Sequence, residues 1–311
     1  MSILESLANK LLIKPGELFS FIKSAPYRYK VYSIPKRNGR GMRIIAQPSE
    51  ALKVMQRLVL DDYLMGLPIH NSATAYIVGK SIRDNALRHA NNPYLLKMDF
   101  SEFFPSISPA DLSLHVKKYK GVVSPEDEFM LRKLFFWAQK HDTRHRLSIG
   151  APSSPFISNT LMYEFDSKLS RACSEKEVVY TRYADDLTLT TRNKDVLFSM
   201  PEFIAGLCQQ IEYPRLQINS EKTVFSSKKH NRHVTGIVIN NKNELSLGRE
   251  KKRFIKSYIY RFSSDELSSV EIIQLRGLLA FAKHVEVSFY NALIAKYGLE
   301  TVSRIERYQP V

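Results

Sequence analysis

The spacing of hydrophobic residues switches repeatedly along this chain between the helical and the strand period, which predicts a mixed α/β (α+β) protein. Apolar residues recur at helical spacing in 2–24 (two short helices), 49–64, 82–89, 108–119, 125–140, 156–170, 200–211, 253–262, 269–284 and 287–307. Aromatic, β-branched and alternating runs predict strands at 27–34, 42–46, 94–98, 180–190 and 233–240. The C-terminal part is therefore expected to be helical, whereas the middle of the chain mixes helices with strands.

The segment 180–190 reads as a β-hairpin with two adjacent aspartates, Asp185 and Asp186, at its turn. Asp favours turns over strands, so the Ala-Asp-Asp sequence is expected to connect the two strands. Two carboxylates side by side are stable only near positive charge, and hard oxygen ligands suit Mg²⁺. A metal site is therefore one interpretation of this turn, and an ordinary exposed Asp-Asp turn is the other.

A third acidic residue, Asp99, ends the apolar strand run 94–98. A carboxylate at the end of a buried strand is costly unless it is paired or bound to metal. Asp99 is therefore predicted to lie beside Asp185 across a sheet. Phe104 follows where the chain turns, and plain core packing is the alternative interpretation of its ring.

Positive charge is unevenly distributed. The sequence holds 46 Lys and Arg against 31 Asp and Glu, a formal charge of +15 with a pI of about 9.6, which favours a polyanionic partner such as nucleic acid. The turn between strands 27–34 and 42–46 carries Lys36, Arg37 and Arg40 and suits phosphate contact. Lys251, Lys252, Arg253 and Lys256 interleave with aromatic residues including Tyr258, a pattern typical of nucleic-acid-binding helices. Solvated surfaces are the alternative in both places.

Other features restrict the environment of the protein. Cys173 and Cys208 stand at no metal-like spacing, which predicts a reducing compartment without a disulfide framework. No apolar run is long enough to span a membrane, and the N-terminus has no signal-peptide pattern. We therefore expect a cytoplasmic protein with no membrane partner.

The order of these signals resembles the palm of reverse transcriptases. Asp99 lies in DFSEFF, GAPSSP follows at 150–155, YADD at 183–186 and Lys222 after it. The NALRH sequence at 85–89 and the VTG sequence at 234–236 are similar to elements of retron reverse transcriptases. The resemblance runs from about residue 28 to residue 236. One departure is Ile149, which stands where the family usually has Gln.

The resemblance implies a right-hand polymerase fold. Residues 1–92 are predicted to form fingers, 93–240 a palm with a ferredoxin-like antiparallel sheet, and 241–311 a helical thumb, with 119–147 returning to the fingers. Two Mg²⁺ ions, replaceable by Mn²⁺, would be held by Asp99, the Phe100 backbone, Asp185 and Asp186. A primer hydroxyl would attack the α-phosphate of a dNTP, with Lys222 as a candidate proton donor to pyrophosphate.

By the same resemblance, the nucleotide-binding residues are predicted to be Arg43, Phe104, Gly150, Ala151, Lys36 and Arg37. Phe104 matches the steric gate that selects dNTPs, and the small residues Gly150 and Ala151 permit close backbone approach. RNA is expected to contact Asn85, His89, Val234, Thr235, Gly236, Lys251, Lys252, Arg253, Lys256 and Tyr258. On the residues alone, His89 reads as a structural hydrogen-bonding residue rather than a catalyst.

Retron enzymes copy their own structured non-coding RNA (msr-msd) from the 2′-OH of an internal guanosine and make a branched RNA–DNA product. The resemblance further implies anti-phage defence with a separate effector protein. Two alternatives stay open at this point. One is another small bacterial reverse transcriptase, of the group II intron or abortive-infection type. The other is a catalytically silent RNA-binding scaffold.

Overall fold

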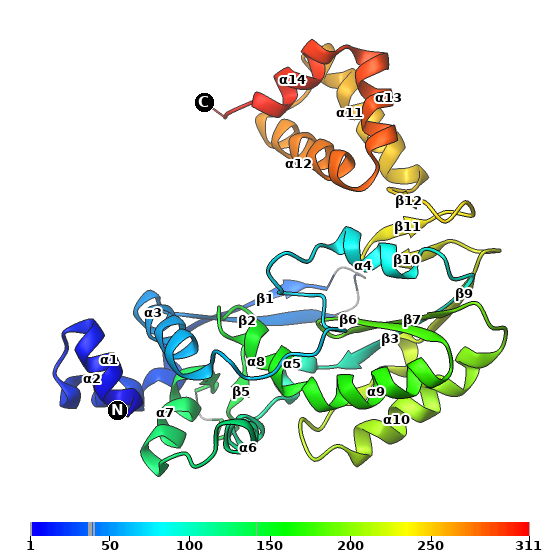
Figure 1. The fold of residues 1–311 in the computed structure, drawn as a ribbon. Coiled ribbons are helices and arrows are strands. Elements are labelled where there is room, and N and C mark those ends of the chain that lie inside the picture. Colours follow the sequence, from blue (N-terminus) through cyan, green and yellow to red (C-terminus); the bar gives the residue numbers. More distant parts are fainter. Residues whose placement is uncertain (1, 37–38, 40, 141, 311) are drawn as a thin grey trace.

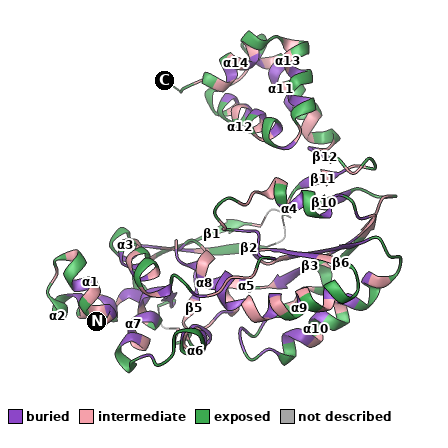
Figure 2. Ribbon diagram, viewed as in Figure 1, coloured by how far each residue is buried: buried purple, intermediate pink, exposed green. Residues whose placement is uncertain are grey.

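The computed structural model describes all residues except 1, 37, 38, 40, 141 and 311. A large α+β body holds the N-terminal two thirds of the chain, and a separate helical lobe follows it (Figure 1). The hydrophobic core of the body extends from Ile3 to Leu216, whereas that of the lobe extends from Leu247 to Ile305. Buried residues accordingly concentrate in the central strands and on the inner faces of the lobe helices (Figure 2).

The N-terminal part of the body consists of α1 (Ile3–Leu11), α2 (Pro15–Lys23), the antiparallel hairpin β1 (Tyr29–Pro35) and β2 (Met42–Pro48), and α3 (Glu50–Val59). Ser2 and Glu5 cap α1 reciprocally, as their spacing predicts. The helix expected over 49–64 changes to a π-helix at Leu60–Leu64. Further along the chain, α7 (Pro125–Phe135) packs on α1, α2 and α3.

A five-stranded antiparallel sheet forms the centre of the body. Its order is β6 (Val178–Tyr183), β7 (Asp186–Thr191), β3 (Tyr94–Ser101) and then β8 (Gln217–Ile218), with β9 (Val224–Ser227) also paired to β3. Helices α9 (Tyr163–Glu175) and α10 (Met200–Gln210) lie along one side of this sheet in Figure 1, and α4 (Ile82–His89) lies on the other. β3 therefore lies between β7, which begins directly after the Asp185 turn, and the later strands β8 and β9.

The remaining elements of the body are short. They are α5 (Phe103–Ser106), α6 (Pro109–Lys120), the strand pair β4 (Phe136–Trp137) and β5 (Arg146–Leu147), α8 (Ser154–Leu161) and the 3₁₀ turns Ala25–Tyr27, Val196–Ser199 and Ser220–Lys222. Two helix predictions differ from the structure in this region. The predicted helix 125–140 ends at Phe135 because Phe136 and Trp137 pair with β5, and the predicted helix 156–170 is divided at Met162.

A small sheet of β10 (Arg232–Val234), β11 (Ile237–Ile239) and β12 (Leu245–Ser246) leads into the helical lobe. The lobe contains α11 (Arg249–Ser263), α12 (Ser269–Val285), α13 (Val287–Tyr297) and α14 (Leu299–Arg307). The helix predicted over 287–307 is divided because Gly298 adopts φ +82°, outside the helical region. Among the described residues, no helix is both long and apolar enough for a membrane span.

Candidate active site

Three aspartates meet where β6, β7 and β3 come together. Ala184 and Asp185 form the two-residue connection between β6 and β7, and Ala184 adopts φ +57°. Asp99 of β3 lies directly opposite Asp186 of β7 in the antiparallel register. The Phe100 backbone N–H donates to the Asp185 carbonyl oxygen at 3.2 Å. The structure thus places Asp99 beside the aspartate pair, as the strand pattern predicted.

This group carries more negative charge than its surroundings balance. Burial, together with the nearby Asp99 and Asp186, raises the pKa of Asp185 from 3.8 to about 6. Burial also raises the pKa of Asp186. Asp99 is only 6% exposed and accepts a hydrogen bond at 2.7 Å from Lys222 Nζ. Mutual repulsion of this kind is relieved when a cation binds.

The donor set fits a hard divalent cation, because carboxylate oxygens are the ligands such ions prefer. Within the described residues, no three His, Cys, Asp or Glu side chains already converge on one point. Asp99 instead turns toward Lys222 Nζ. Lys222 is thus the counter-charge of Asp99 in this structure, and Asp99, Asp185 and Asp186 are the residues that would hold a cation. The proton-donor role of Lys222 stays a prediction.

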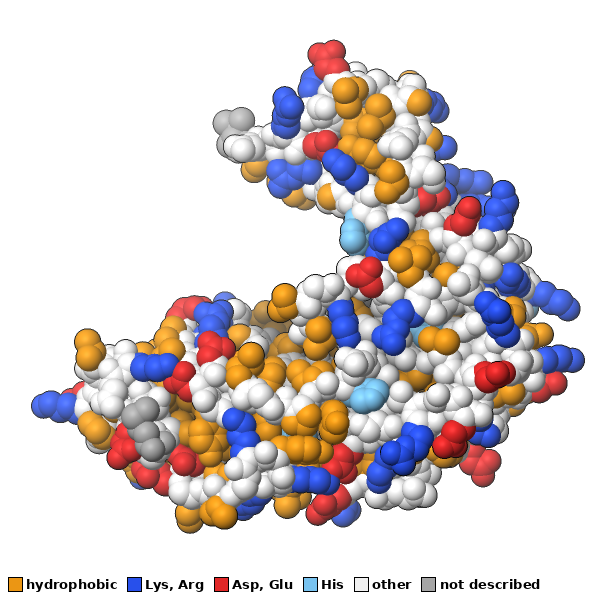
Figure 3. All heavy atoms as spheres, viewed as in Figure 1, with side chains coloured by type: hydrophobic (Ala, Val, Ile, Leu, Met, Phe, Trp, Pro, Cys, Tyr) orange, Lys and Arg blue, Asp and Glu red, His pale blue; other side chains and the backbone are white. Residues whose placement is uncertain are grey.

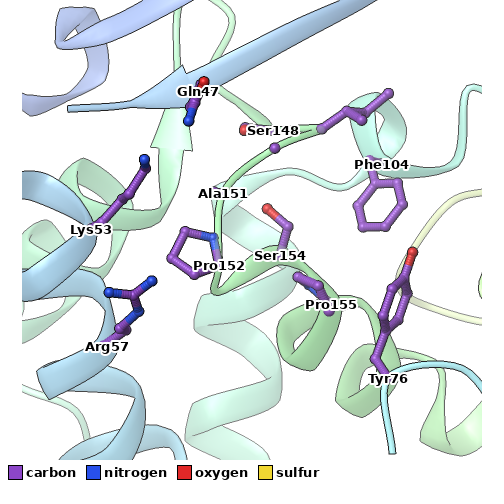
Figure 4. Close-up of a pocket in the computed structure, with 12 residues that line it drawn as sticks. Gln47, Lys53, Arg57, Tyr76, Phe104, Ser148, Ala151, Pro152, Ser154 and Pro155 are labelled. Carbon is purple, nitrogen blue, oxygen red and sulfur yellow. The ribbon is translucent and has the colours of Figure 1, made fainter. Parts of the chain in front are cut away.

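A cavity of about 390 Å³ lies beside Phe104 (Figure 4). Phe104 and Tyr76 stand at one end, and Lys53 and Arg57 of α3 stand at the other. The remaining lining comes from β2, the segment that precedes α8 and the start of α8, namely Gln47, Ser148, Ile149, Gly150, Ala151, Pro152, Ser154 and Pro155. The pocket therefore has an aromatic end and a cationic end, which suits a ligand with a ring and a phosphate.

Gly150 explains how this wall approaches the β1–β2 hairpin so closely. Its φ is +120°, and a Cβ there would lie 3.2 Å from Ile45 Cγ2 and 3.3 Å from the Ala46 carbonyl oxygen. The Ala46 N–H donates to the Ile149 carbonyl oxygen at 3.0 Å, which joins the two segments. Ile149 thus presents its backbone to β2 and lines the pocket with its side chain.

The basic hairpin reaches toward the same region. Lys36 Nζ lies 3.8 Å from Glu102 Oε1, just before Phe104 in the chain. Arg43 is exposed and near enough to Tyr76 to lower the pKa of its phenol, although burial and Asp185 raise that pKa overall. Arg37, also predicted to bind nucleotide, lies outside the described residues.

Tyr76 is a site residue that the sequence did not reveal. It adopts φ +61°, which non-glycine residues rarely do, and its side chain lies across from Phe104 (Figure 4). Asp185 is near enough to contribute, after burial, to the raised pKa of the Tyr76 phenol. Residues 72–74 pair with Arg182 of β6, more than a hundred positions later in the chain, and thereby place Tyr76. The spacing of hydrophobic residues around Tyr76 predicts neither its unusual φ nor this long-range pairing.

Comparison with known proteins decides the family. Residues 34–239 match the family model described as "Reverse transcriptase (RNA-dependent DNA polymerase)". The chain is 43% identical to the Retron Ec83 reverse transcriptase of Escherichia coli over 92% of its own length and 93% of the relative's. It is 30% identical to the Retron Ec73 reverse transcriptase of the same organism over 96% of both chains. The chain belongs to the retron reverse transcriptases.

The retron reverse transcriptase described here is accordingly an RNA-directed DNA polymerase with the right-hand fold, and its partners include RNA. Its family depends on divalent metal ions. Among solved structures, the telomerase of Candida albicans in complex with a telomeric RNA fragment has a TM-score of 0.49 at 13% identity and covers 90% of this chain and 61% of its own. A foamy viral protease-reverse transcriptase with RNA/DNA hybrid has a TM-score of 0.46 at 13% identity, covering 90% and 33% respectively.

Part of the predicted RNA contact of this reverse transcriptase needs correction. Asn85, His89 and Val234 are at most 1% exposed, so their side chains are not available to RNA in this structure. The His89 ring bonds to Thr190 Oγ1 at 2.8 Å and to Thr181 Oγ1 at 2.7 Å, and burial lowers its pKa to about 3. His89 is thus a structural hydrogen-bonding residue that ties α4 to β6 and β7, as its residue type alone suggested.

The other predicted RNA-binding residues of the enzyme lie nearer to solvent. Thr235 is partly buried and Gly236 is exposed, and both adopt positive φ between β10 and β11. Among the basic residues of α11, Lys252 pairs with Glu286, whereas Arg253 and Lys256 are exposed. Lys and Arg side chains gather where the lobe joins the body, and an open hollow separates the two parts on the face seen in Figure 3. RNA binding by these residues stays a prediction.

The raised pKa of Asp185 has a measurable consequence for stability. A folded-state pKa above the ordinary value means that protonation stabilises the fold, an effect that is full below about pH 4 and lost as the pH rises through about 6. In metal-free buffer, Asp185→Asn is therefore expected to raise the unfolding temperature by about 2–4 °C at about pH 8. Thermal unfolding with a chelator present measures this difference.

The increase in unfolding temperature caused by Asp185→Asn should be smaller at about pH 5, because wild-type Asp185 is then largely protonated in the folded state. Asp195→Asn is the matched control, since Asp195 is exposed and lies outside the site. An unfolding temperature raised equally at both pH values would contradict the electrostatic account.

Proposed function

We propose that this reverse transcriptase copies a structured non-coding RNA of its own, starting from the 2′-OH of an internal guanosine, and leaves RNA and DNA covalently branched. The observation that supports this most is the end-to-end similarity to proteins named as retron reverse transcriptases, at 43% identity over almost the whole chain. In this proposal residues 1–92 act as fingers, 93–240 as palm and 241–311 as thumb. The lobe has its own core from Leu247 onward, which supports a thumb that begins near the last of these boundaries, and a third cluster with Val234, Leu245 and Val285 joins the small sheet to the lobe.

In the proposed mechanism, Asp99 and Asp185 are the principal metal ligands, while Asp186 and the Phe100 backbone assist. Two divalent cations, Mg²⁺ or Mn²⁺, would supply Lewis-acid activation of the attacking hydroxyl and of the leaving phosphate when bound. Lys222 neutralises Asp99 before binding, since its Nζ lies 2.7 Å from Asp99 Oδ1. Lys222 would also be the candidate proton donor to pyrophosphate.

The pocket residues position the nucleotide in this proposal. Phe104 and Tyr76 confine the sugar and base at the aromatic end, and Gly150 and Ala151 allow the nucleotide to approach their backbone. Lys36 and Arg43 of the hairpin contribute positive charge toward the triphosphate, and Arg37, which lies outside the described residues, is predicted to assist them. Proximity and charge compensation are the two effects that the protein itself supplies to phosphoryl transfer.

The experiment that tests the branched product is purification of the protein with its native flanking genes, followed by denaturing gels of the bound nucleic acid. We expect a discrete species that RNase shortens without destroying and that DNase removes in part. The change in gel mobility on RNase treatment reports the RNA that is attached to the DNA. DNA without attached RNA would indicate a reverse transcriptase that primes in another way, and RNA alone after adding dNTPs and Mg²⁺ would contradict the proposal.

A role in anti-phage defence with a separate effector protein is the second part of the proposal, and it rests on the retron relationship. Phage plating on cells that carry the native operon tests it. Protection should require both the wild-type enzyme and the neighbouring open reading frame. Equal plating with and without the operon, across a diverse phage panel, would contradict this part alone.

A further inference from the structure

One buried arginine, Arg182, is hydrogen-bonded both to the Asp185 turn and to the segment that carries Tyr76. Arg182 of β6 is fully buried, and its Nε and Nη2 atoms donate to the Asp166 carboxylate of α9 at 2.7–3.1 Å. Asp166 is fully buried as well and also accepts from Tyr180 Oη at 2.7 Å. A paired, planar guanidinium of this kind is held in one orientation.

The third nitrogen of the guanidinium reaches the catalytic turn. Arg182 Nη1 donates to the Ala184 carbonyl oxygen at 3.0 Å. That carbonyl belongs to the residue with φ +57° directly before Asp185. Non-glycine residues adopt this conformation only where neighbouring contacts hold it. Arg182 therefore supplies a contact that keeps the turn in its unusual shape.

The same nitrogen also connects to the wall of the nucleotide pocket. Arg182 Nη1 donates to Asn159 Oδ1 at 3.1 Å, and Asn159 Nδ2 donates to the Ala75 carbonyl oxygen at 2.9 Å. Ala75 immediately precedes Tyr76. The Arg182 backbone adds two bonds to this segment, from its N–H to the Ser72 carbonyl and from the Thr74 N–H to its own carbonyl, both at 2.8 Å.

We propose that Arg182 is a positioning residue that sets the Asp185 turn and the Tyr76 wall of the nucleotide pocket relative to each other, through Asp166 and Asn159. This inference rests on the proposed assignment of Asp185 as a metal ligand. The guanidinium is fully buried, and its hydrogen bonds go to Asp166, Asn159 and Ala184. Arg182 fixes the distance between the Asp185 turn and Tyr76, which must act on one nucleotide. Small displacements of such groups have large effects on the reaction rate.

Arg182→Lys is the first test, because Lys keeps the buried charge and loses the planar fork. Arg232→Lys is the matched control, since Arg232 is equally buried and donates only to atoms away from the site, the backbone oxygens of Ala90, Asn92 and Asn240 and Asn243 Oδ1. Rates on an added primer–template are measured over a Mg²⁺ titration and divided by the folded fraction. We expect Arg182→Lys to lower kcat about 10- to 100-fold and to raise the half-saturating Mg²⁺ concentration, with Arg232→Lys within about twofold of wild type.

Asn159→Ala is the second test, and it leaves the Arg182–Asp166 pair in place if Arg182→Lys does not fold. Because it releases Ala75, it is expected to raise KM for dNTP about tenfold with a smaller change in kcat. Equal losses in Arg182→Lys and Arg232→Lys, or an unchanged KM in Asn159→Ala, would overturn the positioning role. Asp185→Asn in the same assay separates the positioning role of Arg182 from the assignment of Asp185 as a metal ligand. Activity that survives Asp185→Asn refutes the metal assignment itself.

Discussion

Asp185→Asn is expected to lower DNA synthesis on a primed RNA template by about 10³-fold or more, because the variant loses a charged metal ligand worth several kcal/mol in the transition state. Asp99→Asn should cause a loss of similar size, since Asp99 stands opposite Asp186 across the β3–β7 register. The measurement is single-nucleotide extension of a labelled primer under Mg²⁺ saturation. Binding of the same primer–template should stay close to wild type, because nucleic-acid affinity comes mainly from Lys and Arg contacts with the phosphate backbone, which the substitution leaves in place.

Asp195→Asn provides the control for this prediction, as the same chemical change at an exposed position outside the site. Extension by Asp195→Asn should equal that of wild type. Folded Asp185→Asn protein that keeps more than about a tenth of wild-type activity would contradict the role of this carboxylate. Such a result would also remove the basis for a two-metal mechanism in this chain.

The stability prediction and the activity prediction for Asp185 have opposite signs, and this opposition is informative. Burial, together with the neighbouring Asp99 and Asp186, raises the pKa of Asp185 to about 6, which costs the metal-free fold free energy. A turn with a purely structural role would have no reason to keep carboxylates that destabilise the fold. A variant that is more stable and inactive is the combination typical of functional sites.

Local chemistry explains why the hairpin that carries Asp185 and Asp186 was predictable. The alternation in 180–190 and the turn preference of Asp lie within a few residues of each other, so both are visible in the sequence. Asp99 was predictable because a carboxylate at the end of an apolar strand is anomalous on its own. The register that sets it opposite Asp186 follows once the two strands pair.

Long-range contacts explain what the sequence did not reveal. Tyr76 depends on the pairing of residues 72–74 with Arg182, and Asn159 reaches Ala75 across 84 positions. No periodicity connects residues so far apart. The burial of Asn85 and Val234 was missed for a related reason, because α4 and β10 cover each other only after the chain has folded.

Phe104→Ala is expected to raise the use of rNTPs relative to dNTPs by about 10²-fold, because removal of the ring opens space beside the ribose 2′ position. Phe104 lines the pocket opposite the cationic end and packs edge-to-face on Phe103, with ring centroids 5.3 Å apart. The Phe104 ring is thus supported by Phe103 where it lines the cavity. The measurement is the ratio of kcat/KM for matched rNTP and dNTP on one primer–template, which is independent of the folded fraction. Phe104→Tyr preserves the bulk and should preserve discrimination, and an unchanged ratio in Phe104→Ala would show that selection of the sugar lies elsewhere, with Tyr76 as the next residue to replace.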